Sequence, residues 1–285
     1  MPGRGAIHRS IIGSGAHASR WVRGTARAEP VGRDSAATLC YCSERPMASR
    51  PTLPARQPDS PRPTVRRDTA PPGPPLATGR VERWRPVRLG IDPWTVLRLS
   101  RYRRREDVAP AIWETARRMA GRAEELIEST AWLAATAVAA TDPEGARLTD
   151  GPAFSGRAVG SLLAGCPLAV AFVLTLGPRL EGEVAALAER RELLESFLLD
   201  AAGWAAIEAA VRALRLDLRG RAAAVGWRVT HRLAPGYRDW PIEEQRALLG
   251  LLDAAGPAVR LSEHGVLIPF KSITGLFGLA PAREA

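Results

Sequence analysis

Regular patterns of apolar and polar residues occur only in the larger, C-terminal part of the chain. Apolar residues recur every three to four positions over Val108–Glu128, which predicts an amphipathic helix with Asp107 as its N-cap. The pair Asp92-Pro93 predicts an earlier helix over Trp94–Tyr102, because aspartate caps helices well and proline fits the first helical turn. The patterned part of the chain therefore begins with two helices.

The remaining C-terminal residues alternate between helical patterns and short apolar runs. The run Leu168–Thr175 is almost entirely apolar, as is typical of a buried strand. Gly265 can take the positive φ of a hairpin turn between two short strands. Further helices are predicted at Ala158–Ala164, Arg179–Arg190, Leu193–Arg219 and Ile242–Ala254, and further strands at Ala131–Ala140, Trp227–Arg232, Val259–Ser262 and Val266–Pro269. Long helices with scattered strands indicate an α+β fold class.

The first 80 residues show no such pattern and are rich in proline, arginine, serine, threonine and glycine. So little apolar surface cannot offset the entropy lost on ordering, which predicts a disordered tail over residues 1–80 before a folded domain over residues 81–285. The composition of the first 28 residues, which lack acidic side chains, also resembles that of an organelle transit peptide. A further alternative is a start codon assigned too early, with Met47 as an internal start.

The net charge of +10 belongs to the first 90 residues, which hold 16 arginines and 6 acidic residues. Residues 91–285 hold 24 basic and 24 acidic residues, so the domain itself is balanced. The charge therefore does not indicate a nucleic-acid-binding domain, and binding of nucleic acid by the tail is only a third, weaker hypothesis. We expect neither nucleic acid nor a membrane as a partner.

Common local signatures of enzymes and metal sites are missing from the sequence. It contains no G-x-G-x-x-G, G-x-x-x-x-G-K-[ST], H-E-x-x-H or G-x-S-x-G. Cys40 and Cys42 are too close for a relaxed disulfide, and Cys166 lies in an apolar run where a packing role is favoured. No run of 18 uninterrupted apolar residues occurs. These features predict a cytoplasmic protein without a metal site.

Proline, glycine, aromatic and charged residues are most concentrated between Arg232 and Pro241. Pro235-Gly236 predicts a sharp turn at which the backbone can approach a ligand closely. Arg232 before the turn and Tyr237 after it could face one ligand, since arginine binds carboxylates with two donors and tyrosine stacks or donates a hydrogen bond. Residue chemistry alone favours the alternative, a strand-to-helix connection with a surface arginine.

Four segments between Arg232 and Ser272 carry a family resemblance; in chain order they read R-L-A-P-G-Y, D-W-P, E-Q and L-S-E-H-G-V-L-I-P-F-K-S. They resemble the S-adenosylmethionine-binding activation domain of cobalamin-dependent methionine synthase, and more closely its stand-alone bacterial relatives. The upstream segments T-L-G, F-L-L-D-A-A-G-W-A-A-I-E and I-D-P-W-T-V-L-R extend the resemblance over residues 81–281. The expected architecture is a twisted, mostly antiparallel sheet flanked by long helices.

The resemblance implies a site for S-adenosylmethionine. In the family, the arginine of R-x-x-P-G-Y holds the methionine carboxylate of the ligand, and Arg232 occupies that position. Backbone around Leu233 and Ala234 would contact the adenosyl part, with Tyr237 lining the pocket. A helical glutamate pairs with the ligand's amino group, and Glu208 is the candidate. The expected binding residues are therefore Arg232, Leu233, Ala234, Gly236, Tyr237 and Glu208.

The family role is repair of oxidised cobalamin. When cob(I)alamin is oxidised to cob(II)alamin, the domain presents S-adenosylmethionine for a reductive methylation that restores methylcobalamin, with electrons from a flavodoxin-like partner. This chain lacks the D-x-H-x-x-G motif that attaches cobalamin. Its domain also has only one cysteine, so it lacks the three-cysteine zinc site for homocysteine. The resemblance thus implies a component of the methionine synthase system that acts on a corrinoid held by a partner, and not a complete methyltransferase.

The chain departs from the family just after the P-x-K-S segment. The full-length enzyme has several aromatic residues there that help to close the ligand site, whereas Ile273–Phe277 contains one. The alternative function is a non-catalytic module that binds a corrinoid protein through the surface around Tyr237 and Lys271 and has lost the ligand. Lys271 itself is interpreted either as a solvated residue or as a contact to the corrinoid partner or ligand. Trp240 is expected to pack beside Pro241.

Overall fold

The computed structural model describes residues 73–86, 88–253, 256 and 258–282. The predicted tail therefore lies mostly outside the described residues. Its last residues contact the domain, since Leu76 is buried and Thr78 forms a β-bridge with Ala135. Contacts with the sheet thus begin before the predicted boundary at Val81.

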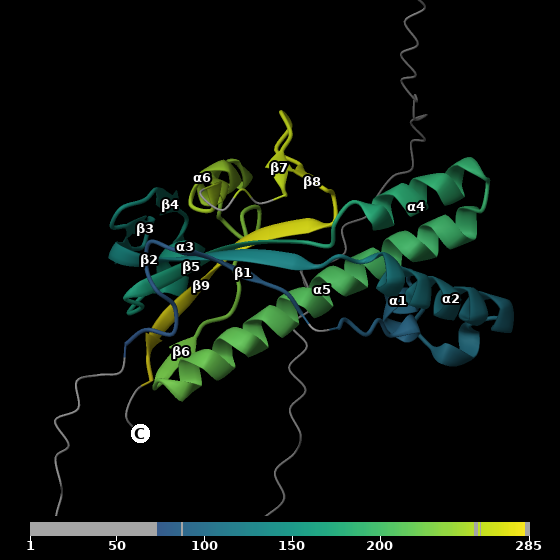
Figure 1. Ribbon diagram of the computed structural model, residues 1–285, viewed down its shortest axis with the longest axis horizontal. Coiled ribbons are helices and arrows are strands. Elements are labelled where there is room, and N and C mark those ends of the chain that lie inside the picture. The colour runs from purple at the N-terminus through teal and green to yellow at the C-terminus, as the bar shows by residue number, and fades with distance from the viewer. Residues whose placement is uncertain (1–72, 87, 254–255, 257, 283–285) are drawn as a thin grey trace, which may run out of the picture. The chain divides into compact units, whose positions relative to one another are not determined.

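Within the described residues, a twisted antiparallel sheet of seven strands forms the centre of the domain (Figure 1). The strands are β1 (Val81–Trp84), β2 (Thr130–Asp142), β3 (Gly145–Leu148), β4 (Ala153–Ser155), β5 (Leu168–Thr175), β6 (Trp227–Val229) and β9 (Ser272–Pro281). Their order is β4-β3-β2-β5-β9-β6, and β1 pairs with the first half of β2. The predicted hairpin is formed by β7 (Arg260–Leu261) and β8 (Leu267–Ile268).

Helices cover both faces of this sheet in the described part of the chain. They are α1 (Pro93–Leu99), α2 (Pro110–Leu126), α3 (Arg157–Leu163), α4 (Arg179–Glu189), α5 (Leu193–Ala224) and α6 (Gln245–Gly250), with 3-10 turns η1 (Arg105–Asp107) and η2 (Ile242–Glu244). One hydrophobic cluster joins α1, α2, α4 and α5 to one face of the sheet, and a second joins α3 and α6 to the other. This arrangement confirms the expected α+β fold. None of the described helices combines the length and apolar character needed to cross a membrane.

Strand β5 shows why the apolar run at its position is unbroken. All eight of its residues are buried. Val170 and Phe172 contact the cluster on the α5 side, whereas Ala171 and Val173 contact the cluster on the α3 side. Because both faces of the strand are covered, alternation with polar residues is lost. The predicted bounds, Leu168–Thr175, are confirmed.

Several helix boundaries differ from the prediction, among them the ends of α1 and α5, the start of α2 and both ends of α6. Asp107 does not cap α2; it lies in η1, and Ala109 precedes the helix without a side-chain hydrogen bond. Pro110 in the first turn, with its fixed φ, accounts for this start. The helix predicted over Ile242–Ala254 begins with η2 and continues as α6 only to Gly250. The cap predicted at Asp92 is confirmed, with its carboxylate accepting from the backbone of the first turn.

Strand β9, which lies between β5 and β6, was not predicted. Gly275 and Gly278 interrupt its apolar pattern, and glycine is unfavourable within strands. In the structure, a Cβ on Gly275 would lie 2.6 Å from the carbonyl oxygen of Leu233, and one on Gly278 would lie 2.7 Å from Sγ of Cys166. These glycines therefore permit close packing against neighbours that are distant in sequence.

Candidate ligand-binding site

The structure brings Arg232 and Glu208 together. Nη2 of Arg232, in the segment after β6, donates to Oε1 of Glu208 on α5 at 3.3 Å. The Arg232 side chain is 19% exposed, and its Nη1 is buried without a hydrogen-bond partner among the described residues. Because an unpaired buried donor is costly, Nη1 is suited to an oxygen atom of a ligand.

An extra residue in the segment after β6 accounts for the direction of Arg232. Val229 pairs with Leu279, and Leu233 pairs with Leu276, so one strand advances by four residues while its partner advances by three. Such a bulge disrupts the ladder and redirects side chains. Leu233 then contacts the cluster on the α3 side, while Arg232 reaches Glu208 on α5. The bulge also explains why β6 ends at Val229 and not at Arg232.

The turn after Arg232 is held by its own backbone. Gly236 has a φ of 83°, and its N–H donates to the carbonyl oxygen of Trp240 at 2.9 Å. The N–H of Tyr237 donates to the carbonyl oxygen of Ala234 at 3.2 Å. Leu233 exchanges both of its backbone hydrogen bonds with Leu276. Leu233 and Ala234 are buried, whereas the Tyr237 side chain is 55% exposed at the edge of the turn.

The Ala-rich sequence around Glu208 indicates a helix that is mostly core and hence a buried acid, but the structure places this side chain at the surface. Its side chain is 59% exposed, on a face of α5 that it shares with the exposed Trp204 one helical turn earlier. The sequence-based expectation is wrong because alanines on both flanks of Glu208 face the core while Glu208 faces outward. An exposed carboxylate beside Arg232 still gives the site one anion and one cation.

Lys271 is buried, so its interpretation as a solvated residue is wrong. The residue is 1% exposed, and its Nζ donates to Oδ1 of Asp200 at 2.6 Å. The same ammonium lies 4.4 Å from the ring centre of Trp204 and 4.9 Å from that of Phe270, in cation–π geometry. Gly203 leaves room for it, because a Cβ there would lie 2.8 Å from Cε of Lys271.

Aromatic surface near Glu208 comes from residues that the sequence analysis did not select. Trp204 and Phe270 are 42% and 51% exposed, and their rings meet edge to face at 5.8 Å between centroids. Phe277, the aromatic residue of the stretch after P-x-K-S, is instead buried and stacked on Phe172 at 5.0 Å. The sequence could have indicated Trp204, because it lies four residues before Glu208 and residues four apart share one face of a helix.

Substitutions of the two partners in the Lys271–Asp200 pair are expected to lower stability by different amounts. Asp200→Asn is expected to lower the free energy of unfolding by about 2 kcal/mol, because it leaves the buried ammonium without a counter-charge. Lys271→Met is expected to cost less, because it removes the buried charge and leaves Asp200, whose side chain is 44% exposed, in contact with water. Urea denaturation of both variants measures the difference. A larger loss for Lys271→Met would contradict this view of the pair.

Asp239 fixes the turn to α3. Its two carboxylate oxygens accept from the backbone N–H groups of Arg157 and Ala158 at 2.7 and 3.0 Å. Its pKa is held below the usual range, chiefly by the hydrogen bond from Ala158 and further by that from Arg157. The turn and the first residues of α3 are therefore connected through one ionised side chain.

Protonation of Asp239 is expected to weaken this connection at acid pH. A carboxyl group with a lower pKa in the folded chain adds stability above its unfolded pKa of about 3.9, and the contribution is lost as the pH falls through the folded pKa. The Tm difference between wild type and Asp239→Asn should therefore be largest near neutral pH and shrink below about pH 4. Thermal melts across this range provide the measurement. An unchanged difference would show that Asp239 does not act through its charge.

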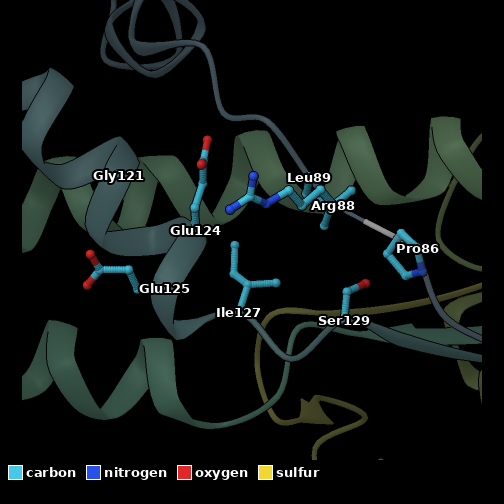
Figure 2. Close-up of a pocket in the computed structure, with 8 residues that line it drawn as sticks. All are labelled: Pro86, Arg88, Leu89, Gly121, Glu124, Glu125, Ile127 and Ser129. Atoms are coloured by element: carbon cyan, nitrogen blue, oxygen red, sulfur yellow. The ribbon is translucent and has the colours of Figure 1, made fainter.

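A cavity of about 480 Å³ lies elsewhere, between α2 and the segment before α1 (Figure 2). Figure 2 shows the guanidinium of Arg88 extending toward Glu124, while the carboxylate of Glu125 points away. Oε1 of Glu124 accepts from the N–H of Ile91 at 2.7 Å, so this carboxylate already helps to hold the start of α1. None of the predicted site residues lines this cavity. Across the described residues, no group of three or more potential ligands could hold a metal ion.

The fold and the paired charges define an α+β domain with an arginine–glutamate pair at the junction of α5 and the segment after β6. Among solved structures, the chain is similar to the crystal structure of the MetH reactivation domain bound to AdoHcy, with a TM-score of 0.51 and 15% sequence identity. The similarity covers 74% of this chain and 82% of that chain, and it shows a shared fold. The comparisons with protein-family models and with curated proteins gave no match.

Proposed function

We propose that this chain binds S-adenosylmethionine and presents it for the reductive methylation, and thus the reactivation, of a cobalamin held by a partner protein. The observation that carries the proposal is the Arg232–Glu208 pair, with its unpartnered Nη1, in a fold shared with a reactivation domain whose solved structure contains AdoHcy. The sequence resemblance between Arg232 and Ser272 supports the same assignment independently of the fold.

The methionine part of the ligand is complementary to this pair. It carries a carboxylate and an ammonium group on one carbon atom, so it needs a cation and an anion side by side. Arg232 would hold the carboxylate with Nη1 and Nη2, and Glu208 would accept from the ammonium. In the free protein the two side chains share a single 3.3 Å hydrogen bond. Replacing that bond costs little, since a half-exposed ion pair contributes at most about 1 kcal/mol.

The adenosyl part would lie along the turn that follows Arg232. The backbone N–H and C=O of Leu233 are occupied by Leu276, and the C=O of Ala234 and the N–H of Gly236 are occupied within the turn. We therefore assign the backbone contacts to the N–H of Ala234 and the C=O of Gly236. The missing side chain of Gly236 leaves room for Ile242, whose Cδ1 would lie 3.2 Å from a Cβ there, and the exposed Tyr237 follows it in the chain. The alternative role of Lys271 as a direct ligand contact is not part of the proposal, since its ammonium is enclosed by Asp200 and two aromatic rings.

The chemistry of the reaction would be divided among several proteins. This chain's residues bind and orient the methyl donor, and a corrinoid protein such as a cobalamin-dependent methionine synthase supplies the methyl acceptor. A flavodoxin-like partner supplies the electron. The chain is thus a component of a methyltransferase system, and its own task is to position one ligand.

Titration calorimetry of the wild-type chain with S-adenosylmethionine tests this proposal. We expect a dissociation constant in the micromolar range and a rise in Tm with ligand concentration, because a ligand that binds only the folded chain stabilises it. Absence of both heat and a Tm shift would overturn the proposal. The non-catalytic alternative would then be favoured if a corrinoid protein were still captured by the wild type and equally by Arg232→Ala.

A further inference from the structure

A smaller cavity opens on the opposite side of the segment that carries Arg232. It has a volume of about 190 Å³ and lies between α3 and the residues that follow β6. Arg157 and Ser161 line it from α3, and His231 and Arg238 line it from the segment after β6. Arg232 itself is turned away, toward α5, so this cavity is separate from the Arg232–Glu208 pair.

Basic groups in this cavity lack acidic partners. Neither Arg157 nor Arg238 forms a salt bridge with any described residue. Asp239, the one acid in the lining, has both carboxylate oxygens engaged by the backbone N–H groups of Arg157 and Ala158. Its charge is therefore compensated first by backbone dipoles and only to a smaller extent by the guanidinium of Arg157. The cavity has a surplus of positive charge.

Burial and the surplus of positive charge both lower the pKa of His231. Its pKa is lowered first by burial of the imidazole and then by the positive charges of Arg238 and Arg215. Arg215, on α5, donates through Nε to the carbonyl oxygen of Thr230 at 3.1 Å, next to His231 in the chain. The charged groups around the imidazole are thus three arginines and Asp239. An anion among them would relieve the repulsion and favour the protonated imidazole.

We propose that this cavity is a binding site for a phosphoryl group, held by Arg157, Arg238 and His231. Guanidinium groups match the oxygens of a phosphate with paired donors, and the imidazolium and the Ser161 hydroxyl add further donors. The volume is below the roughly 300–1,000 Å³ of pockets for drug-sized ligands, so the site admits the phosphoryl group and not a whole nucleotide. The group belongs either to inorganic phosphate or to the end of a larger monoester.

NMR titration of the full chain tests the site, with inorganic phosphate and glycerol 3-phosphate as probes at constant ionic strength. We expect the imidazole signals of His231 to shift toward the protonated form and its pKa to rise with either probe. The probe that binds with the higher affinity identifies the source of the phosphoryl group. Unchanged His231 signals with both probes, against a sodium chloride reference, would overturn the proposal.

Matched variants separate a specific site from general attraction of anions. Arg238→Gln and Arg157→Gln are each expected to weaken phosphate binding about tenfold, the effect of losing one hydrogen bond to a charged group. Arg103→Gln, which removes an exposed arginine that does not line the cavity, should leave the affinity unchanged. Equal affinity in all three variants would overturn the proposal, provided that their thermal melts match the wild type.

Sulfate provides a pH test, because it keeps both charges throughout the titration of a histidine. Its affinity should rise as the pH falls through the pKa of His231 in the complex, and His231→Gln should remove that dependence. A dependence that persisted in His231→Gln would assign it to another group and overturn the role of the imidazole. None of these measurements involves S-adenosylmethionine, so their outcome is independent of the function proposed above.

Discussion

Replacement of Arg232 by alanine is expected to weaken the binding of S-adenosylmethionine about 100-fold. Removing one partner of a desolvated charge pair costs about 2–5 kcal/mol, and here the ligand carboxylate would be left beside Glu208 without a cation. The side chain is 19% exposed, so the interaction is only partly screened by water. Titration calorimetry against the wild type measures the loss directly.

Three further variants test whether the loss of affinity in Arg232→Ala is specific to the paired charges of the site. Arg232→Lys should recover only part of the affinity, because an ammonium cannot offer two parallel donors. Glu208→Gln should weaken binding while leaving the arginine in place. Arg219→Ala, which removes an exposed arginine of α5, should bind like the wild type. Wild-type affinity in Arg232→Ala, with an unchanged Tm, would remove Arg232 from the site.

Trp240→Ala is expected to lower the free energy of unfolding by about 3–5 kcal/mol, the range for truncating a large buried aromatic side chain. Trp240 is 1% exposed and meets Phe154 edge to face at 5.5 Å between ring centroids. Its Nε1 donates to Oε2 of Glu244 at 2.8 Å, and since that oxygen also accepts from the N–H of Ser155 at 3.0 Å, truncation removes one of its two donors. Urea denaturation of the variant provides the measurement.

Trp240→Ala should also disturb the candidate ligand site, because backbone hydrogen bonds connect Trp240 to the turn after Arg232. Trp240 accepts from the N–H of Gly236 and donates to the carbonyl oxygen of Tyr237, so a displaced Trp240 would loosen the turn. Tyr237→Ala is the control from the same turn, since its half-exposed ring should cost less than about 1 kcal/mol. Similar losses for Tyr237→Ala and Trp240→Ala would contradict the anchoring role of Trp240.

Local signals in the sequence predicted many of the elements correctly. The apolar run of β5, the Asp92 cap of α1 and the Gly265 turn each depend on residues that are adjacent in the chain, and all three are present in the structure. The predicted end of β6 was wrong because pairing with β9 decides it, whereas the predicted start of α2 was wrong because Pro110 begins that helix. Strand β9 was missed because Gly275 and Gly278 weaken its pattern, although they are needed for contact with Leu233 and Cys166.

For the candidate site, the sequence supplied Arg232, the turn and, through the family resemblance, the choice of Glu208. It could not show that Arg232 is largely buried while Glu208 is exposed, since these exposures depend on the bulge after β6 and on the face that α5 presents. Nor did it select Trp204 and Phe270, whose contact joins residues of α5 to those just before β9.

Residue type and local order are enough to predict the α+β class, the concentration of positive charge in the first 90 residues and the turn at Pro235-Gly236. The burial of Lys271, in contrast, depends on the tertiary structure. A lone lysine after an apolar strand is ordinarily solvated, but Gly203 leaves space for its stem and Asp200 supplies its counter-charge. Burial of a charge depends on partners that the fold brings from 71 residues away, and no local pattern contains that information.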